Sequence, residues 1–163
     1  MTTVARGARR IAPEMPLCRA SIAFDRPARS RQPRILLVED EPAISGSLTR
    51  FLNARGYVVD RAEDVETALA VLEWCTIDAV ILDILLAPPG CRAECGLDVL
   101  TTIRQRPGLA GLPVVILTGV PLDDAMRAVI ARHGAAVFCK PENYATIARY
   151  LEGVIHRIPT SGT

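Results

Sequence analysis

The stretch RILLVEDEP, residues 34–42, places four consecutive apolar residues directly before three carboxylates and a proline. An apolar run without polar alternation is typical of a strand that is buried on both faces. Pro42 suits the first turn of a helix, and apolar residues recur after it at helical spacing until Gly56. The stretch therefore predicts a buried strand and a following helix, with acidic side chains where the strand ends.

The same alternation continues along the chain. Further strands are predicted at residues 57–59, 79–82, 114–117 and 137–139, and further helices around residues 65–72, 96–103, 122–130 and 147–155. Five strands alternating with five helices predict an α/β fold, a doubly wound five-stranded parallel sheet with helices on both faces. A chain of 163 residues is long enough for one such core.

The charge is distributed unevenly. Residues 1–34 contain eight arginines but only Glu14 and Asp25 as acidic residues, which favours a disordered basic N-terminal extension over residues 1–33. A folded domain is expected at residues 34–157 and a short C-terminal tail at 158–163. A solvated segment is the favoured interpretation of the extension, and a docking segment for an acidic partner, lipid or nucleic acid is the alternative. Over the whole chain, 19 basic residues nearly balance 18 acidic ones, so net charge does not indicate nucleic acid as the main partner.

The cysteines and the apolar runs point to the cytoplasm. The five cysteines are odd in number and irregularly spaced, which argues against a disulfide-stapled secreted fold. Cys91 and Cys95 lack the further ligands at matching spacing that a zinc site needs, so loop thiols are favoured and a redox-sensitive disulfide is the alternative. No apolar run approaches the roughly 18 residues of a membrane span, so none is expected.

Polar residues follow four of the predicted strands, and ligand sites of such sheets lie at this edge. They are Glu39 and Asp40, Asp83, Thr118, and Lys140. Carboxylates packed together repel one another, and Mg²⁺ with its preference for oxygen ligands relieves that repulsion. The hydroxyl and the ammonium can donate to phosphoryl oxygens, and an aspartate can act as a phosphoryl nucleophile. Each residue alone could merely cap a helix or turn, but together they predict a Mg²⁺ and phosphate site with Asp83 as nucleophile.

Four segments now carry a family resemblance: RILLVEDEP (34–42), DAVILDILL (78–86), LPVVILTG (112–119) and GAAVFCKP (134–141). In this order they resemble the signature segments of the receiver domains of two-component response regulators, a bacterial type of signalling protein. The resemblance covers roughly residues 34–157. It implies the flavodoxin-like strand order 2-1-3-4-5.

The resemblance also implies residue roles. A Mg²⁺ site would comprise Glu39, Asp40, Asp83 and the backbone carbonyl of Leu85, with Asp83 also the phosphoacceptor, Thr118 and Lys140 as phosphoryl-binding switch residues, and a cis peptide bond before Pro141. The phosphoryl group would come from a phosphohistidine on a sensor histidine kinase or histidine phosphotransfer protein. No DNA-binding domain is expected after the last helix, so the output would be contact with an unknown protein target, with homodimerisation on phosphorylation left open.

Two alternatives remain at this point. One is a receiver-like binding module that is never phosphorylated. The other is an aspartyl-phosphate phosphatase of the haloacid-dehalogenase type, which is disfavoured because that family has a second aspartate where this chain has Leu85. A signalling switch rather than an enzyme is therefore the leading expectation.

Three features depart from the family pattern. The loop after Asp83 is longer than is usual, and Val137 occupies a switch position that is usually aromatic. Leu85 and Val120 stand at two positions that tune the loss of the phosphoryl group. Because neither apolar side chain can orient an attacking water molecule, a long-lived phosphoryl group is predicted.

Overall fold

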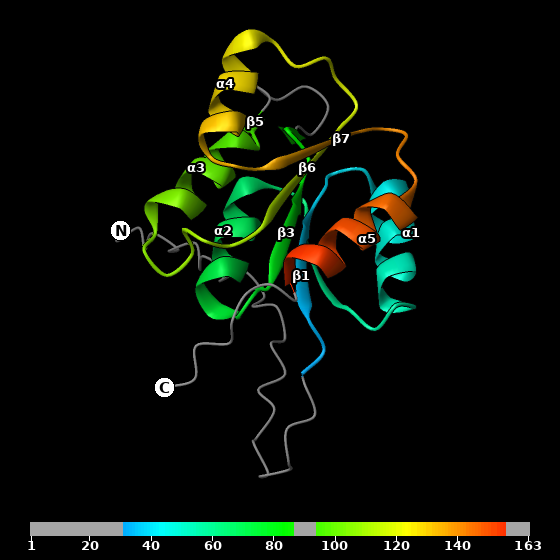
Figure 1. The fold of residues 1–163 in the computed structure, drawn as a ribbon. Coiled ribbons are helices and arrows are strands. Elements are labelled where there is room, and N and C mark those ends of the chain that lie inside the picture. Colours follow the sequence, from blue (N-terminus) through cyan, green and yellow to red (C-terminus); the bar gives the residue numbers. More distant parts are fainter. Residues whose placement is uncertain (1–30, 87–93, 156–163) are drawn as a thin grey trace, which may run out of the picture.

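The computed structural model describes residues 31–86 and 94–155. Its central sheet is parallel and has the order β2-β1-β3-β6-β7 (Figure 1). The strands are β1 (Arg34–Val38), β2 (Val58–Ala62), β3 (Ala79–Leu82), β6 (Val114–Thr118) and β7 (Ala136–Cys139). Counted within this sheet alone, the order is 2-1-3-4-5, so the predicted doubly wound, flavodoxin-like fold is confirmed.

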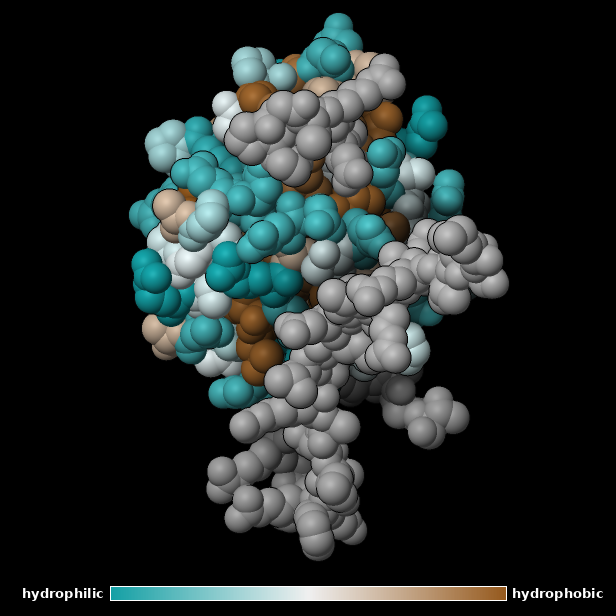
Figure 2. Space-filling model, turned by 180° about the vertical axis from the view of Figure 1, so that it is seen from behind, coloured by the Kyte–Doolittle hydropathy of each residue, from teal (hydrophilic) through white to brown (hydrophobic). Residues whose placement is uncertain are grey.

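Helices cover both faces of the sheet. They are α1 (Pro42–Asn53), α2 (Val65–Trp74), α3 (Leu97–Gln105), α4 (Asp124–Arg132) and α5 (Tyr144–Ile155). Alternate residues of β1 belong to different cores: Leu37 packs with apolar residues of α1 and α5, and Leu36 with those of α2, α3 and α4. Hydrophilic residues cover much of the surface seen in Figure 2, with hydrophobic ones in smaller patches. None of the helices within the described residues is long and apolar enough to cross a membrane.

Local signals fix where the helices begin and end. The carboxylates of Asp64 and Asp123 cap α2 and α4, each accepting a hydrogen bond of 2.7 Å from a backbone N–H of the first turn. Gly56 and Gly134 follow α1 and α4 with φ of 87° and 62°, a conformation that glycine adopts without steric cost. These turns return the chain from α1 to β2 and from α4 to β7, and the parallel pairing brings the carboxyl ends of all five strands to one edge.

The long loop after Asp83 differs from the prediction. It contains two short strands, β4 (Leu85–Leu86) and β5 (Glu94–Cys95), which pair as an antiparallel hairpin. A strand of two residues is too short to show an alternating pattern in the sequence. The two strands are also separated by seven residues, 87–93, so no short turn indicates their pairing. Residues 87–93, and with them Cys91, lie outside the described residues.

The predicted terminal segments and the cysteines are only partly covered by the described residues. The expected extension and the C-terminal tail lie outside the described residues, except for residues 31–33. Within that remainder, the Arg31 guanidinium forms hydrogen bonds of 2.9 and 2.7 Å with the carboxylate of Asp78. Cys75 is disulfide-bonded and Cys139 is free and exposed, a difference that the irregular cysteine spacing did not predict.

Arg104 joins three parts of the fold, and its removal should destabilise the protein. Its guanidinium donates hydrogen bonds of 2.8 Å to the carbonyl oxygens of His133 and Leu112, and burial lowers its pKa. Arg104→Met leaves both carbonyls without this donor, so we expect the free energy of unfolding to fall by about 2 kcal/mol. Urea denaturation measures this loss, with the exposed Arg149 replaced by Met as the control. Equal losses in the two variants would contradict the prediction.

Candidate functional site

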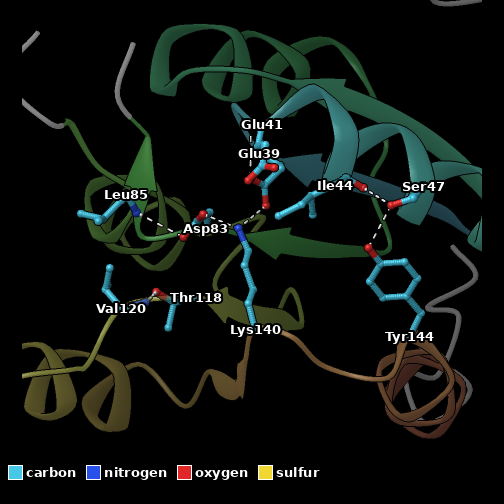
Figure 3. A network of polar contacts seen from close by, with 10 residues as sticks. All are labelled: Glu39, Glu41, Ile44, Ser47, Asp83, Leu85, Thr118, Val120, Lys140 and Tyr144. Carbon is cyan, nitrogen blue, oxygen red and sulfur yellow. Dashed lines mark hydrogen bonds and ion pairs between the residues drawn. The ribbon is translucent and has the colours of Figure 1, made fainter. Parts of the chain in front are cut away.

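The sheet register brings the predicted site residues to one edge. Val38 pairs with Leu82, so Glu39 and Asp83, the residues that follow them, lie side by side. Thr118, the last residue of β6, pairs with Cys139, and the backbone N–H of Lys140 donates to the Thr118 carbonyl at 2.8 Å. Figure 3 shows the side chains of Glu39, Asp83 and Lys140 converging from three different strand ends.

Lys140 forms the central polar contact of this edge. Its Nζ donates to Glu39 Oε2 and to Asp83 Oδ2, each at 2.6 Å (Figure 3). Glu39 is 2% exposed and Asp83 is 8% exposed, so both carboxylates are almost removed from water. Lys140 is also the only lysine of the chain. One ammonium therefore bridges two buried carboxylates that would otherwise face each other.

Lys140 places one positive charge between two carboxylates. Burial raises the pKa of Glu39, and the hydrogen bond from Lys140 only partly opposes that shift. Burial lowers the pKa of Lys140, but its hydrogen bonds with Asp83 and Glu39 outweigh burial and raise the pKa overall. Lys140 is thus held in its charged form. One ammonium thus faces the two carboxylates of Glu39 and Asp83, and these two carboxylates can accommodate a second cation as well.

The three carboxylates can hold such a cation. One oxygen from each of Glu39, Asp40 and Asp83 can be chosen so that all three atoms lie within 4.8 Å of one another. The donors are hard oxygens from two buried residues and the half-buried Asp40. This set fits a hard divalent cation that keeps some of its water ligands.

The remaining predicted residues lie around this cluster. The N–H of Leu85 donates to Asp83 Oδ1 at 3.3 Å, and the N–H of Val120 donates to Oγ1 of the buried Thr118 at 3.3 Å. Each of these backbone groups comes from the residue two positions after the side chain that it contacts. The Lys140–Pro141 peptide bond is cis, which is the geometry that the resemblance implies.

Val137, at the position that is usually aromatic in the family, lies on a different sheet face from the neighbouring Phe138. The side chain of Val137 is exposed, whereas the adjacent Phe138 packs on the opposite sheet face against Tyr150, with ring centroids 5.7 Å apart. Phe138 therefore does not replace the aromatic residue that the family usually has at the switch position, as strand alternation predicts.

One residue beside the site was not singled out by the sequence. Gly96 lies between β5 and α3, and its N–H donates to the Ile84 carbonyl at 2.7 Å. The available signal was a glycine where a helix begins, a position at which Ser, Thr, Asp or Asn is more usual. That signal does not reveal which backbone the glycine approaches.

Comparisons with known proteins agree on one family. The family described as "Response regulator receiver domain" matches residues 35–152. The chain is 35% identical over 127 residues to the transcriptional regulatory protein QseB of Haemophilus influenzae, covering 76% of this chain and 53% of that protein. It is 38% identical over 85 residues to the transcriptional regulatory protein TcrA of Mycobacterium tuberculosis, covering 52% and 31% respectively. The chain thus spans about half or less of the length of these relatives.

Solved structures agree with the fold. A CheY-like receiver domain protein from Methanospirillum hungatei is 25% identical with a TM-score of 0.67, covering 76% of this chain and 94% of that one. A putative response regulator from Chloroflexus aurantiacus is 28% identical with a TM-score of 0.66, covering 77% and 99%. These matches do not favour the phosphatase alternative. Because the family match covers well over half of the chain, the protein belongs to the response-regulator receiver domain family.

Proposed function

We propose that this receiver domain works as a Mg²⁺-dependent phosphorylation switch whose phosphoacceptor is Asp83. The observation that carries the proposal is the contact of Lys140 with Glu39 and Asp83, at 2.6 Å each, beside the three-carboxylate cluster. This arrangement combines a buried nucleophile, an ammonium for phosphoryl oxygens and oxygen ligands for a cation. No one of these groups alone would indicate phosphoryl chemistry.

The proposed mechanism is mainly positioning and charge neutralisation. Glu39, Asp40, Asp83 and the backbone carbonyl of Leu85 would hold Mg²⁺, which supplies positive charge for the phosphoryl oxygens. An Asp83 carboxylate oxygen attacks the phosphorus of a phosphohistidine, the P–N bond breaks, and its electron pair remains on the imidazole. Lys140 and the Thr118 hydroxyl then hold oxygens of the new acyl phosphate.

Partners follow from this chemistry as further parts of the proposal. The phosphoryl donor is a sensor histidine kinase or a histidine phosphotransfer protein in the cytoplasm. The relatives are transcriptional regulators by name, but this chain matches only about half or less of their length. The output proposed for the receiver itself is therefore contact with a protein target after phosphorylation.

The direct test is the intact mass of the protein after incubation with Mg²⁺ and acetyl phosphate. We expect a phosphate adduct of about 80 Da that is absent when EDTA removes Mg²⁺. A histidine kinase that phosphorylates receiver domains serves as the second donor. If folded protein gives no adduct with either donor, the chain is a binding module that works without phosphorylation.

The phosphoryl group should be long-lived because of the residue at position 85. The Leu85 side chain is 38% exposed at the edge of the site, where it offers no polar atom to an attacking water. In Leu85→Asn an amide could orient that water, so we expect the half-life of the adduct to fall about tenfold, less than the roughly hundredfold effect of a full general base. Leu85→Met, which stays apolar, is the control.

The half-life is measured as the loss of the adduct after the donor is removed by desalting. Two outcomes would contradict this prediction: a wild-type half-life of seconds, or equal half-lives for Leu85→Asn and Leu85→Met.

A further inference from the structure

The loop that carries Asp83 continues directly into the β4–β5 hairpin. Leu85 and Leu86 pair antiparallel with Cys95 and Glu94, in that order. The hydrogen bond from the Gly96 N–H to the Ile84 carbonyl adds a further contact at the base of the hairpin. Since antiparallel pairs alternate in hydrogen bonding, Ile84–Gly96 and Leu86–Glu94 are the hydrogen-bonded pairs. The hairpin thus begins at the residue after the phosphoacceptor.

Gly96 fits at the base of this hairpin because it has no side chain. A Cβ atom built on Gly96 would overlap the carbonyl oxygen of Asp83 and come within 3.1 Å of its carbonyl carbon and 3.2 Å of Ile84 Cα. All three are backbone atoms, so no flexible side chain can move aside. The φ of Gly96 is −55°, which any residue can adopt, and the requirement is therefore for space rather than for backbone freedom.

The residues that follow Asp83, on the other side of the Gly96 contact, are also held in place. Ile84 and Leu86 are fully or almost fully buried and belong to the same core cluster as Leu100 of α3. The Gly96 carbonyl accepts a hydrogen bond of 3.2 Å from the Leu100 N–H, which ties the hairpin base to the first turn of α3. The backbone after Asp83 is therefore held between the core and the start of a helix.

The hairpin base is linked through the backbone to the atoms that the proposed chemistry uses. Asp83 Oδ1 accepts from the Leu85 N–H, and Asp83 Oδ2 accepts from Lys140. A shift of the Asp83–Ile84 backbone would move both the carboxylate and the Leu85 carbonyl, which is a ligand in the proposed Mg²⁺ site.

We propose that the base of the β4–β5 hairpin, where Gly96 contacts the backbone of Asp83 and Ile84, holds the backbone from Asp83 to Leu85 in position. The same proposal makes residues 87–93, between the two strands, dispensable for the chemistry at Asp83. Gly96 is then a positioning residue, which acts through the backbone of Asp83. The inference rests on the proposed phosphorylation of Asp83.

The test compares four changes in the full chain. Gly96→Ala places a methyl group in the confined space at the hairpin base. Glu94→Pro removes the backbone N–H that Glu94 donates within the Leu86–Glu94 pair. Replacement of residues 87–93 by Asn-Gly keeps the base and closes it with a two-residue turn. Gly153→Ala, at a position in α5 where an added Cβ meets nothing within 4 Å, is the matched control.

The readout is the rate of adduct formation with acetyl phosphate as a function of Mg²⁺ concentration, for variants whose circular dichroism is that of folded protein. For Gly96→Ala we expect a rate about a hundredfold lower, as for a reacting group misplaced by about 1 Å, and a higher half-saturating Mg²⁺ concentration. Glu94→Pro should change both quantities in the same direction, and it serves as the test if Gly96→Ala does not fold. The Asn-Gly and Gly153→Ala variants should match the wild type.

The outcomes separate this inference from the proposed function. If the wild type forms no adduct, phosphorylation of Asp83 itself is wrong. If the wild type forms the adduct and folded Gly96→Ala or Glu94→Pro does so at the same rate and the same Mg²⁺ requirement, the positioning role is overturned. A rate for the Asn-Gly variant as low as that of Gly96→Ala would overturn the dispensability of residues 87–93.

Discussion

Asp83→Asn should abolish the Mg²⁺-dependent phosphate adduct and leave the fold intact. The substitution exchanges a carboxylate oxygen for an amide nitrogen of nearly the same size, so the space between β3 and β4 remains filled. An amide lacks the negative charge that the proposed roles of Asp83, as nucleophile and as cation ligand, require. Its carbonyl oxygen can still accept the hydrogen bond that Lys140 now donates to Oδ2, which favours retention of the local geometry.

The experiment uses intact mass with acetyl phosphate and Mg²⁺, followed by peptide mapping of the adduct. Asp98→Asn makes the same chemical change at an exposed position of α3 and should keep the full adduct. An adduct that persists in folded Asp83→Asn would mean that another residue accepts the phosphoryl group, and the assignment to Asp83 would then be wrong.

The sheet and its functional edge were predictable because their signals are local. The apolar runs before Glu39 and Asp83 identify buried strands, and the polar residue that follows each run marks the carboxyl end of that strand. Strand order then places these ends together whatever the details of packing. For this reason the sequence predicts a site at this edge, and the Lys140 contacts with Glu39 and Asp83 agree with it.

The hairpin and the role of Gly96 depend on contacts that are distant in sequence. Leu86 pairs with Glu94 across residues 87–93, and strands of two residues contain no readable period. The close approach of Gly96 to the Asp83 carbonyl is a steric fact about two backbones, and a glycine in the sequence does not reveal its neighbour.

The double contact of Lys140 was likewise beyond the sequence. The strand pattern predicts Lys140 at the same edge as Glu39 and Asp83, but it does not show that one ammonium contacts both carboxylates. In the absence of a divalent cation these contacts reduce the repulsion between Glu39 and Asp83, and they imply a second role for Lys140. Besides its proposed contact with phosphoryl oxygens, Lys140 would stabilise the unphosphorylated domain.

Lys140→Met should therefore destabilise the protein strongly without Mg²⁺ and much less with it. Removing one partner of a buried ion pair leaves uncompensated charge, which costs about 3 kcal/mol of unfolding free energy. Glu39 and Asp83 then lose the ammonium that they share, and a bound divalent cation takes over its compensating role. Because the ammonium no longer repels that cation, the variant should bind Mg²⁺ more tightly than the wild type does, although it should be phosphorylated more slowly.

Urea denaturation of wild type and Lys140→Met, each with EDTA and with saturating Mg²⁺, measures this difference. Ligand binding to the folded state adds stability that grows with affinity, so the gap between the two proteins should narrow when Mg²⁺ is present. Arg149→Met, which removes an exposed cation from α5, should show no gap that depends on Mg²⁺. A Lys140→Met loss that is the same with and without Mg²⁺ would mean that the ammonium and the cation do not act on the same carboxylates. The proposed Mg²⁺ and phosphoryl site would then not include Lys140.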